Sequence, residues 1–287
     1  MKKLLASAAI LAGGLWWITG PDVSPPSILN GLTADLANGE HVFHAGGCAS
    51  CHADKDASDP LPVLSGGTRL ASDFGTFITP NISSDPVHGI GDWSALDLWN
   101  AMHHGTSPDG AHYYPAFPYS SYNKVTPQDV VDLHGFLGTL PASDVASAPH
   151  ELGFPFSIRR SLGAWKLLAL STDWHQPATD EQSERGRYLV EALGHCTECH
   201  TPRNAIGILK SDAWMHGAPN PSGKGEIPAL HPAAFDWAPE DIAYYLETGF
   251  TPDFDSVGGS MASVVENFGK LPTADREAVA AYIAALP

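Results

Sequence analysis

Every cysteine of the chain lies in one of two motifs, CASCH at residues 48–52 and CTECH at residues 196–200. Two thiols three residues apart on a helical turn can add to the two vinyl groups of one haem, and the following imidazole can bind the iron. The thiols concerned are Cys48, Cys51, Cys196 and Cys199. Two disulfides or one zinc site are the competing interpretations. Neither explains a histidine after each second cysteine, so the motifs predict two covalent haem c groups with His52 and His200 as proximal iron ligands.

The surroundings of the two motifs are repeated along the chain. WSALDLWNAMHHGTSPD at 93–109 aligns without a gap with WAPEDIAYYLETGFTPD at 237–253. TPQDVVDLHGFLGTLP at 126–141 aligns with PTADREAVAAYIAALP at 272–287. The apolar spacing predicts a helix in each stretch, and thus two like units that each hold one haem motif between helices.

A glycine precedes each motif on the same face as an apolar residue at i+4. Gly39 and Gly186 are expected to let another helix approach closely, because glycine has no side chain. Phe136 and Tyr282 occupy equivalent places in the closing helices, and we expect each to pack against the helix that bears the glycine.

These units resemble class I cytochrome c domains. The whole chain resembles the cytochrome subunits of membrane-bound bacterial alcohol, gluconate and related sugar dehydrogenases. The matching stretches are FGTFITPNISSDPVHGIGDWS (74–94), SPDGAHYYPAFPYSSYNKVTPQDV (107–130), FPFSIRRSLGAWKLL (154–168) and RGRYLVEALGHCTECHTPRNAIG (185–207). The resemblance implies an all-α fold of two tandem class I domains. Such subunits commonly carry three haem motifs, whereas this chain has two.

We expect four segments. Residues 1–24 are a signal peptide or N-terminal membrane anchor, and residues 30–141 are the first cytochrome c domain. Residues 142–180 form an interdomain linker with a short amphipathic helix, and residues 181–287 are the second domain. The linker contains FPFSIRRSLGAWKLL, which is expected either to pack between the units or to dock a dehydrogenase or a membrane.

In this family a methionine thioether usually binds the iron opposite the histidine and raises the reduction potential. Met261 lies nine residues after Pro252, in the loop where the family places that ligand. Nine residues after Pro108, the equivalent of Pro252, comes Phe117, which cannot bind iron. The second haem is therefore assigned Met261, and the first haem needs another ligand or has an open iron.

The helix expected at 93–105 supplies the first candidate. If it is regular, Met102 faces the haem, as its equivalent Leu246 does in the second unit. A distortion near Gly105 would favour His104 instead. The histidine alternatives are His103, His104 and His112.

Other residues near the motifs have less specific roles. The indole N–H groups of Trp93 and Trp237 and the guanidinium of Arg203 are candidate partners for haem propionates, with core packing or a surface position as the alternative. The carbonyl of Pro202 is a candidate acceptor for the ring N–H of His200.

The N-terminus and the overall charge limit where the protein works. Two lysines precede an apolar run from Leu4 to Gly20, a pattern typical of export and at the short limit for a membrane span. We expect the protein in the bacterial periplasm, either soluble or anchored to the inner membrane. The net charge is −17 with no basic stripe, which excludes nucleic acid as a partner.

The motifs and the resemblance together predict an electron-transfer protein and not an enzyme. A dehydrogenase would be the electron donor, and a quinone, an oxidase or a soluble cytochrome the acceptor. The alternative is a haem enzyme with an open distal site at the first haem, of a peroxidase or sulfur-compound oxidoreductase type, and the replacement of methionine by Phe117 motivates it.

Overall fold

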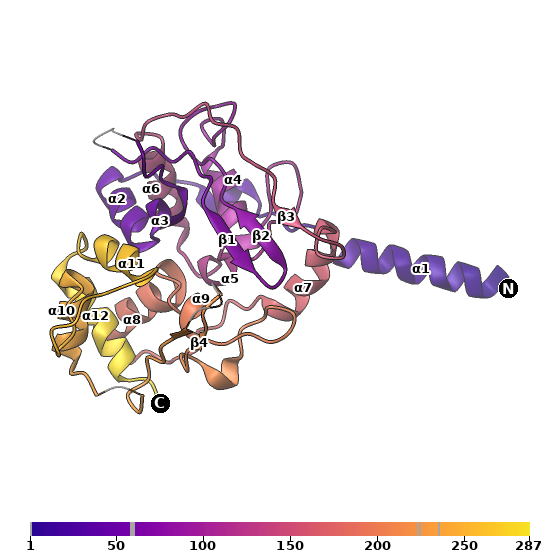
Figure 1. Ribbon diagram of the computed structural model, residues 1–287. Helices are drawn as coiled ribbons and strands as arrows, with labels where there is room; N and C mark the ends of the chain where they lie inside the picture. The colour runs from indigo at the N-terminus through magenta and orange to yellow at the C-terminus, as the bar shows by residue number, and fades with distance from the viewer. Residues whose placement is uncertain (1, 58–60, 222, 224, 235) are drawn as a thin grey trace.

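Two helical halves pack side by side, and one helix extends away from them (Figure 1). The computed structural model describes residues 2–57, 61–221, 223, 225–234 and 236–287. The helices of the first half are α2 (Leu36–Ala45), α3 (Cys48–His52), α4 (Ala95–Trp99), the π-helical turn η2 (Asn100–His104), α5 (Tyr119–Tyr122) and α6 (Pro127–Leu137). Those of the second half are α8 (Glu181–Arg187), the π-helical turn η4 (Tyr188–Leu193), α9 (Thr197–His200), α10 (Pro239–Thr248), α11 (Met261–Phe268) and α12 (Thr273–Ala284). Short 3-10 turns are η1 (Pro26–Leu29) and η5 (Ser211–Ala213).

The fold is mostly helical, but the expectation of an all-α protein needs correction, because two small sheets are present. Strands β1 (Arg69–Ser72) and β2 (Gly75–Ile78) form an antiparallel hairpin, and β3 (Glu151–Leu152) pairs with β2. Strands β4 (Ala218–Pro219) and β5 (Glu226–Ile227) form a second pair. All of these strands are short and lie in the long loops outside the helical repeats. Helical periodicity, the signal used for the repeats, could not reveal them.

The glycines before the two motifs are where helices meet, as predicted. A Cβ added to Gly39 in α2 would lie 2.2 Å from the carbonyl oxygen of Asp132 and 2.7 Å from the Cβ of Phe136, both in α6. A Cβ added to Gly186 in α8 would lie 2.1 Å from the carbonyl oxygen of Ala278 and 3.0 Å from the Cβ of Tyr282, both in α12. The prediction that Phe136 and Tyr282 pack against the glycine-bearing helices is therefore confirmed. This crossing fixes the helix that leads into each haem motif.

The segment between the two repeats follows the first half closely. After β3 it forms η3 (Arg159–Ser161) and α7 (Leu162–Ala169), which lies near the base of the N-terminal helix (Figure 1). The side-chain amide of Asn81 donates to the carbonyls of Ser143 and Val145, each at 2.8 Å. Residues 142–180 thus pack against the first half as well as connecting the two halves.

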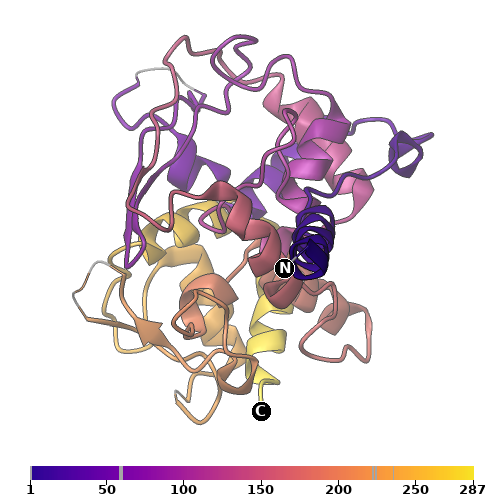
Figure 2. The ribbon, with the colours of Figure 1, turned by 90° about the vertical axis from the view of Figure 1, so that its right-hand side faces the viewer.

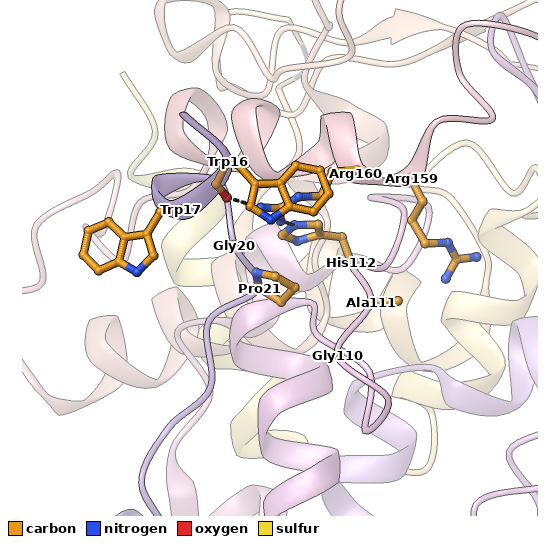
Figure 3. A pocket seen from close by; sticks show the side chains of 9 residues that line it. All are labelled: Trp16, Trp17, Gly20, Pro21, Gly110, Ala111, His112, Arg159 and Arg160. Atoms are coloured by element: carbon orange, nitrogen blue, oxygen red, sulfur yellow. Dashed lines mark hydrogen bonds between the residues drawn. The ribbon is translucent and has the colours of Figure 1, made fainter. Parts of the chain in front are cut away.

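The N-terminal helix α1 (Lys2–Ile18) projects from the body and is seen end-on in Figure 2. Across the residues that the structure describes, no helix is both long enough and apolar enough to cross a membrane. The base of α1 is fastened to the first half around a pocket that Figure 3 shows. There Arg160 donates to the carbonyls of Trp16 and Thr19, and its guanidinium lies 4.3 Å from the centre of a Trp16 ring.

Candidate haem-binding site

Both cysteine motifs lie at the start of a short helical turn that follows a longer helix. Cys48 and Cys51 belong to α3, whereas Cys196 directly precedes α9 and Cys199 lies within it. None of the four is paired in a disulfide, which does not fit the interpretation of the motifs as two disulfides. Burial, helped by the neighbouring cysteine, raises the pKa of Cys48 and of Cys196 to about 12. Within the described ranges, no group of three or more His, Cys, Asp or Glu side chains is placed to hold a metal ion. This arrangement does not fit the zinc site that was the other competing interpretation of the motifs.

The histidines that end the two motifs are held in the same way. His52 Nδ1 lies 2.8 Å from the carbonyl oxygen of Pro80, and His200 Nδ1 lies 2.8 Å from the carbonyl oxygen of Pro228. Because the carbonyl can only accept, Nδ1 carries the hydrogen and Nε2 is left with its lone pair for a metal. Burial lowers the pKa of both rings, although the bond to the carbonyl opposes it, which favours the neutral, ligating imidazole.

Pro202, the sequence-based candidate for this role, is not the partner of His200. Its carbonyl accepts from the backbone N–H of Lys210 at 2.9 Å. The actual acceptors, Pro80 and Pro228, follow their histidines by 28 residues each. That equal spacing of a proline in both repeats was the signal in the sequence that could have identified them.

The loops that lead to Phe117 and to Met261 share a backbone arrangement. In the first half the N–H of Tyr113 donates to the carbonyl of Gly105, and in the second half the N–H of Val257 donates to that of Gly249, both at 2.7 Å. The bridges between Thr106 and His112 and between Phe250 and Ser256 are likewise equivalent. This correspondence supports the alignment of Phe117 with Met261. Both side chains are partly buried and pack against the hydrophobic core.

Among the candidate ligands of the first haem, Met102 and His112 are the most enclosed. Met102 is 4% exposed within the hydrophobic core, and its equivalent Leu246 is 5% exposed. The helix is not regular there, because residues 100–104 form the π-helical turn η2. The assumption of a regular helix up to Gly105 is therefore wrong, so α-helical spacing cannot be used to orient Met102. What the structure shows is that the Met102 side chain is buried in the hydrophobic core.

The three histidine candidates have other contacts. His103 stacks on Trp99 with ring centres 4.4 Å apart. His104 Nε2 lies 2.8 Å from Ser24 Oγ, and His112 Nε2 lies 3.0 Å from the carbonyl oxygen of Thr19. The last two rings face the segment that follows α1. The helix is distorted near Gly105, the case in which the sequence favours His104, but the Nε2 atom of His104 is engaged by Ser24.

The candidate propionate partners are placed near the helix starts and the second motif. Trp93 and Trp237 are partly buried and pack against the core, and the Trp237 ring lies 5.3 Å from that of Tyr245. Arg203 forms an ion pair with Glu198 and donates to the carbonyl of Gly207 at 2.8 Å. Its guanidinium is thus already shared between a carboxylate and a carbonyl.

The residues present fit a covalently attached haem in each half. Each site offers two thiols on one turn and an imidazole whose second nitrogen is fixed by a carbonyl, which is the outer-sphere arrangement typical of ligating histidines. A haem bound there would be held by the cysteines, ligated by the histidine and surrounded by the apolar side chains of its own half.

Comparison with known proteins finds similarity to cytochromes c. Residues 36–141 match the family model for cytochrome c. The chain is 56% identical to a dihaem cytochrome c-type protein of Cereibacter sphaeroides, over 100% of this chain and 98% of that relative. It is 33% identical to the fructose dehydrogenase cytochrome subunit of Gluconobacter japonicus, over 88% of this chain, and 33% identical to the gluconate 2-dehydrogenase cytochrome c subunit of Pantoea cypripedii, over 89% of this chain. The aligned region covers only 52% and 62% of those two relatives.

Proposed function

The chain belongs to the cytochrome c family and binds haem c covalently, and from this premise we propose that it is a dihaem electron-transfer subunit serving a dehydrogenase. The observation that carries the proposal is the pair of equivalent attachment sites, each with a proximal histidine fixed at 2.8 Å by a proline carbonyl. Bound haem supplies one-electron chemistry between ferric and ferrous iron. The protein transforms no substrate in this role.

The residues of the chain set the properties of each site. His52 and His200 ligate through Nε2, and their bonds to Pro80 and Pro228 keep each ring oriented and its nitrogen basic. We assign Met261 as the distal ligand in the second half, because it stands at the end of the loop that the two halves share.

For the first half we assign Met102 as the distal ligand. It is buried in the core of that half, whereas Nε2 of His104 and of His112 is engaged by the N-terminal segment. With a protein ligand present, the first haem would also serve electron transfer, and an open catalytic iron is not favoured.

The partner is inferred from two relatives whose names place them in fructose and gluconate dehydrogenases. We propose that a dehydrogenase on the periplasmic side of the inner membrane donates the electrons. A quinone, an oxidase or a soluble cytochrome would accept them. Residues 1–24 would serve as a signal peptide or as an anchor.

The mass of the purified protein and its near-infrared spectrum test the assignment. Unfolding in acid and organic solvent should leave a polypeptide heavier by two haems, and a colourless chain of bare mass would refute the proposal.

In the near-infrared spectrum of the oxidised protein, thioether-to-iron bands from two sites are expected. Met102→Ala should remove one of them and should allow carbon monoxide to bind the reduced first haem. Two persisting bands would rule out Met102, and carbon monoxide uptake by the unaltered protein would reveal an open iron.

A further inference from the structure

Two segments of the chain lack acidic residues, although the protein carries a net charge of −17. Residues 1–21 and residues 152–172 contain no Asp or Glu, whereas the whole chain contains 32. The cations of the second segment are Arg159, Arg160 and Lys166. The acidic side chain that directly precedes it, Glu151, is already paired with Arg69. An anionic surface would therefore meet the least repulsion where these two segments come together.

The two segments contact each other at the base of α1. A Cβ added to Gly163 in α7 would lie 2.0 Å from the carbonyl oxygen of Thr19, so the two backbones touch there. Arg160 donates to the same carbonyl and to the carbonyl of Trp16. Beside this contact lies the pocket of Figure 3, about 440 Å³ in volume, which is lined in part by side chains from both segments. The base of α1 and residues 152–172 thus form one continuous part of the surface.

Large apolar side chains are exposed on both sides of this contact. The exposed fractions are 67% for Trp16, 82% for Trp17, 61% for Leu167 and 73% for Leu168. Leu167 lies one helical turn after Gly163, on the side of α7 that meets the base of α1. We call these four residues, together with Arg159, the base face. Exposed apolar side chains are ordinary when scattered singly, but a group beside an apolar helix marks an interaction surface.

The cation of the base face is available to an anionic group. Arg159 lines the pocket with Trp16 and Trp17. Its guanidinium lies 5.1 Å from the centre of the Tyr114 ring, and among the residues that the structure describes it forms no ion pair. The guanidinium of Arg160, by contrast, is occupied by the two carbonyls at the end of α1.

This composition fits a lipid surface better than a protein partner. Indole rings favour the boundary between the headgroups and the acyl chains of a bilayer, and arginine pairs with lipid phosphates. The base face also continues into α1, whose exposed side chains include Ile10, Leu11 and Leu15. A docked protein would cover the base face but would leave that projecting apolar helix in water, whereas a bilayer covers both.

We propose that the base face rests on a bilayer that contains anionic phospholipids. Trp16, Trp17, Leu167 and Leu168 enter the boundary layer, α1 contacts the acyl chains, and Arg159 pairs with phosphate groups. Contact of this kind requires no helix that crosses the bilayer. The inference rests on the exposed side chains and the charge distribution, and it is independent of the ligands assigned to either haem.

Two pairs of variants separate charge from apolar contact. Arg159→Glu reverses the cation of the base face, and Lys210→Glu makes the same change of net charge in an exposed loop of the second half. Leu167→Ser combined with Leu168→Ser removes apolar surface from α7. Val87→Ser is its control, because Val87 is a similarly exposed apolar residue outside both segments.

The experiment measures flotation of the full, haem-loaded chain with vesicles of phosphatidylcholine alone or mixed with phosphatidylglycerol. The unaltered protein should bind the mixed vesicles several-fold more tightly, and added salt should weaken that preference. Arg159→Glu should weaken binding to the mixed vesicles by about fivefold or more, the factor for one cation beside an anionic surface. The Leu167→Ser, Leu168→Ser variant should bind both kinds of vesicle less tightly, and both controls should behave as the unaltered protein.

Three outcomes would overturn the inference. Equal affinity for the two kinds of vesicle would exclude recognition of anionic lipid. Unchanged binding in Arg159→Glu and in the double leucine variant would leave the base face to a protein partner. A purified chain whose mass shows that residues 1–20 have been removed would take α1 away from the face.

A second measurement on the unaltered chain avoids any effect of the substitutions on folding. Hydrogen exchange of residues 152–172 should slow when the mixed vesicles are added, because the bilayer covers them, whereas residues 83–92 should exchange as before. Equal exchange of residues 152–172 with and without vesicles would contradict a bilayer resting on this face.

Discussion

Replacing Gly186 by alanine should destabilise the second half measurably. The added Cβ would lie 2.1 Å from the carbonyl oxygen of Ala278, a backbone atom that cannot rotate away, and 3.0 Å from the Cβ of Tyr282. Overpacking of this kind costs about 1–3 kcal/mol, and a clash with backbone belongs at the upper end. Alanine recovers about 1 kcal/mol of helix propensity relative to glycine. The net loss is therefore about 2 kcal/mol, or about 4–8 °C in Tm.

Gly138→Ala is the matched control. Gly138 has an ordinary helical backbone with φ −64°, and an added Cβ would meet nothing nearer than 3.4 Å. This variant should be unchanged or more stable by about 0.4–1 kcal/mol, because alanine restricts the unfolded chain. Thermal unfolding of the haem-loaded proteins followed by circular dichroism provides the comparison. If Gly186→Ala melts with or above the unaltered protein, α8 and α12 do not approach as closely as described, and the reasoning about this crossing fails.

Two further predictions concern charged contacts. Burial alone would raise the pKa of Asp275, but hydrogen bonds from Arg185 and from His41, at 2.5 Å, outweigh it and hold that pKa well below its usual range. A carboxylate with a depressed pKa stabilises the fold above its unfolded pKa of about 4, and loses that contribution as pH falls further. Asp275→Asn should thus lower the free energy of unfolding, measured in urea at neutral pH, by roughly 2 kcal/mol. The difference between the variant and the unaltered protein should shrink below about pH 4. An equal difference at neutral and at acidic pH would contradict this prediction. Arg160→Ala removes one donor to each of the Trp16 and Thr19 carbonyls, so limited proteolysis near residues 16–20 should become faster. An unchanged rate would show that other contacts, such as that of His112 with Thr19, hold this segment.

The sequence could predict the features that depend on short spacing. Cysteines three residues apart and an adjacent histidine lie on one turn whatever the rest of the chain does. Gly39 and Gly186 were predictable for a similar reason, because an i, i+4 pattern places residues on one helix face. The internal repeat then allowed each half to be checked against the other, which led from Met261 to Phe117.

Features that depend on long loops could not be predicted in this way. The proline carbonyls that hold His52 and His200 are 28 residues away through chain without helical periodicity. The π-helical turn at 100–104 inserts an extra residue per turn, and no propensity in that stretch indicates it. Pairing of β3 with β2 requires knowing that the connecting segment returns to the first half.

The equivalence of the two halves makes their differences interpretable. The distal loops share backbone hydrogen bonds and bridges, so Phe117 and Met261 differ in chemistry on a common frame. If the first iron takes its thioether from Met102, that ligand comes from the buried turn η2, whereas Met261 begins α11 and is only partly buried. Burial and solvent access around the iron affect the reduction potential even when the ligand atoms are the same. The two haems should therefore differ in potential despite identical attachment.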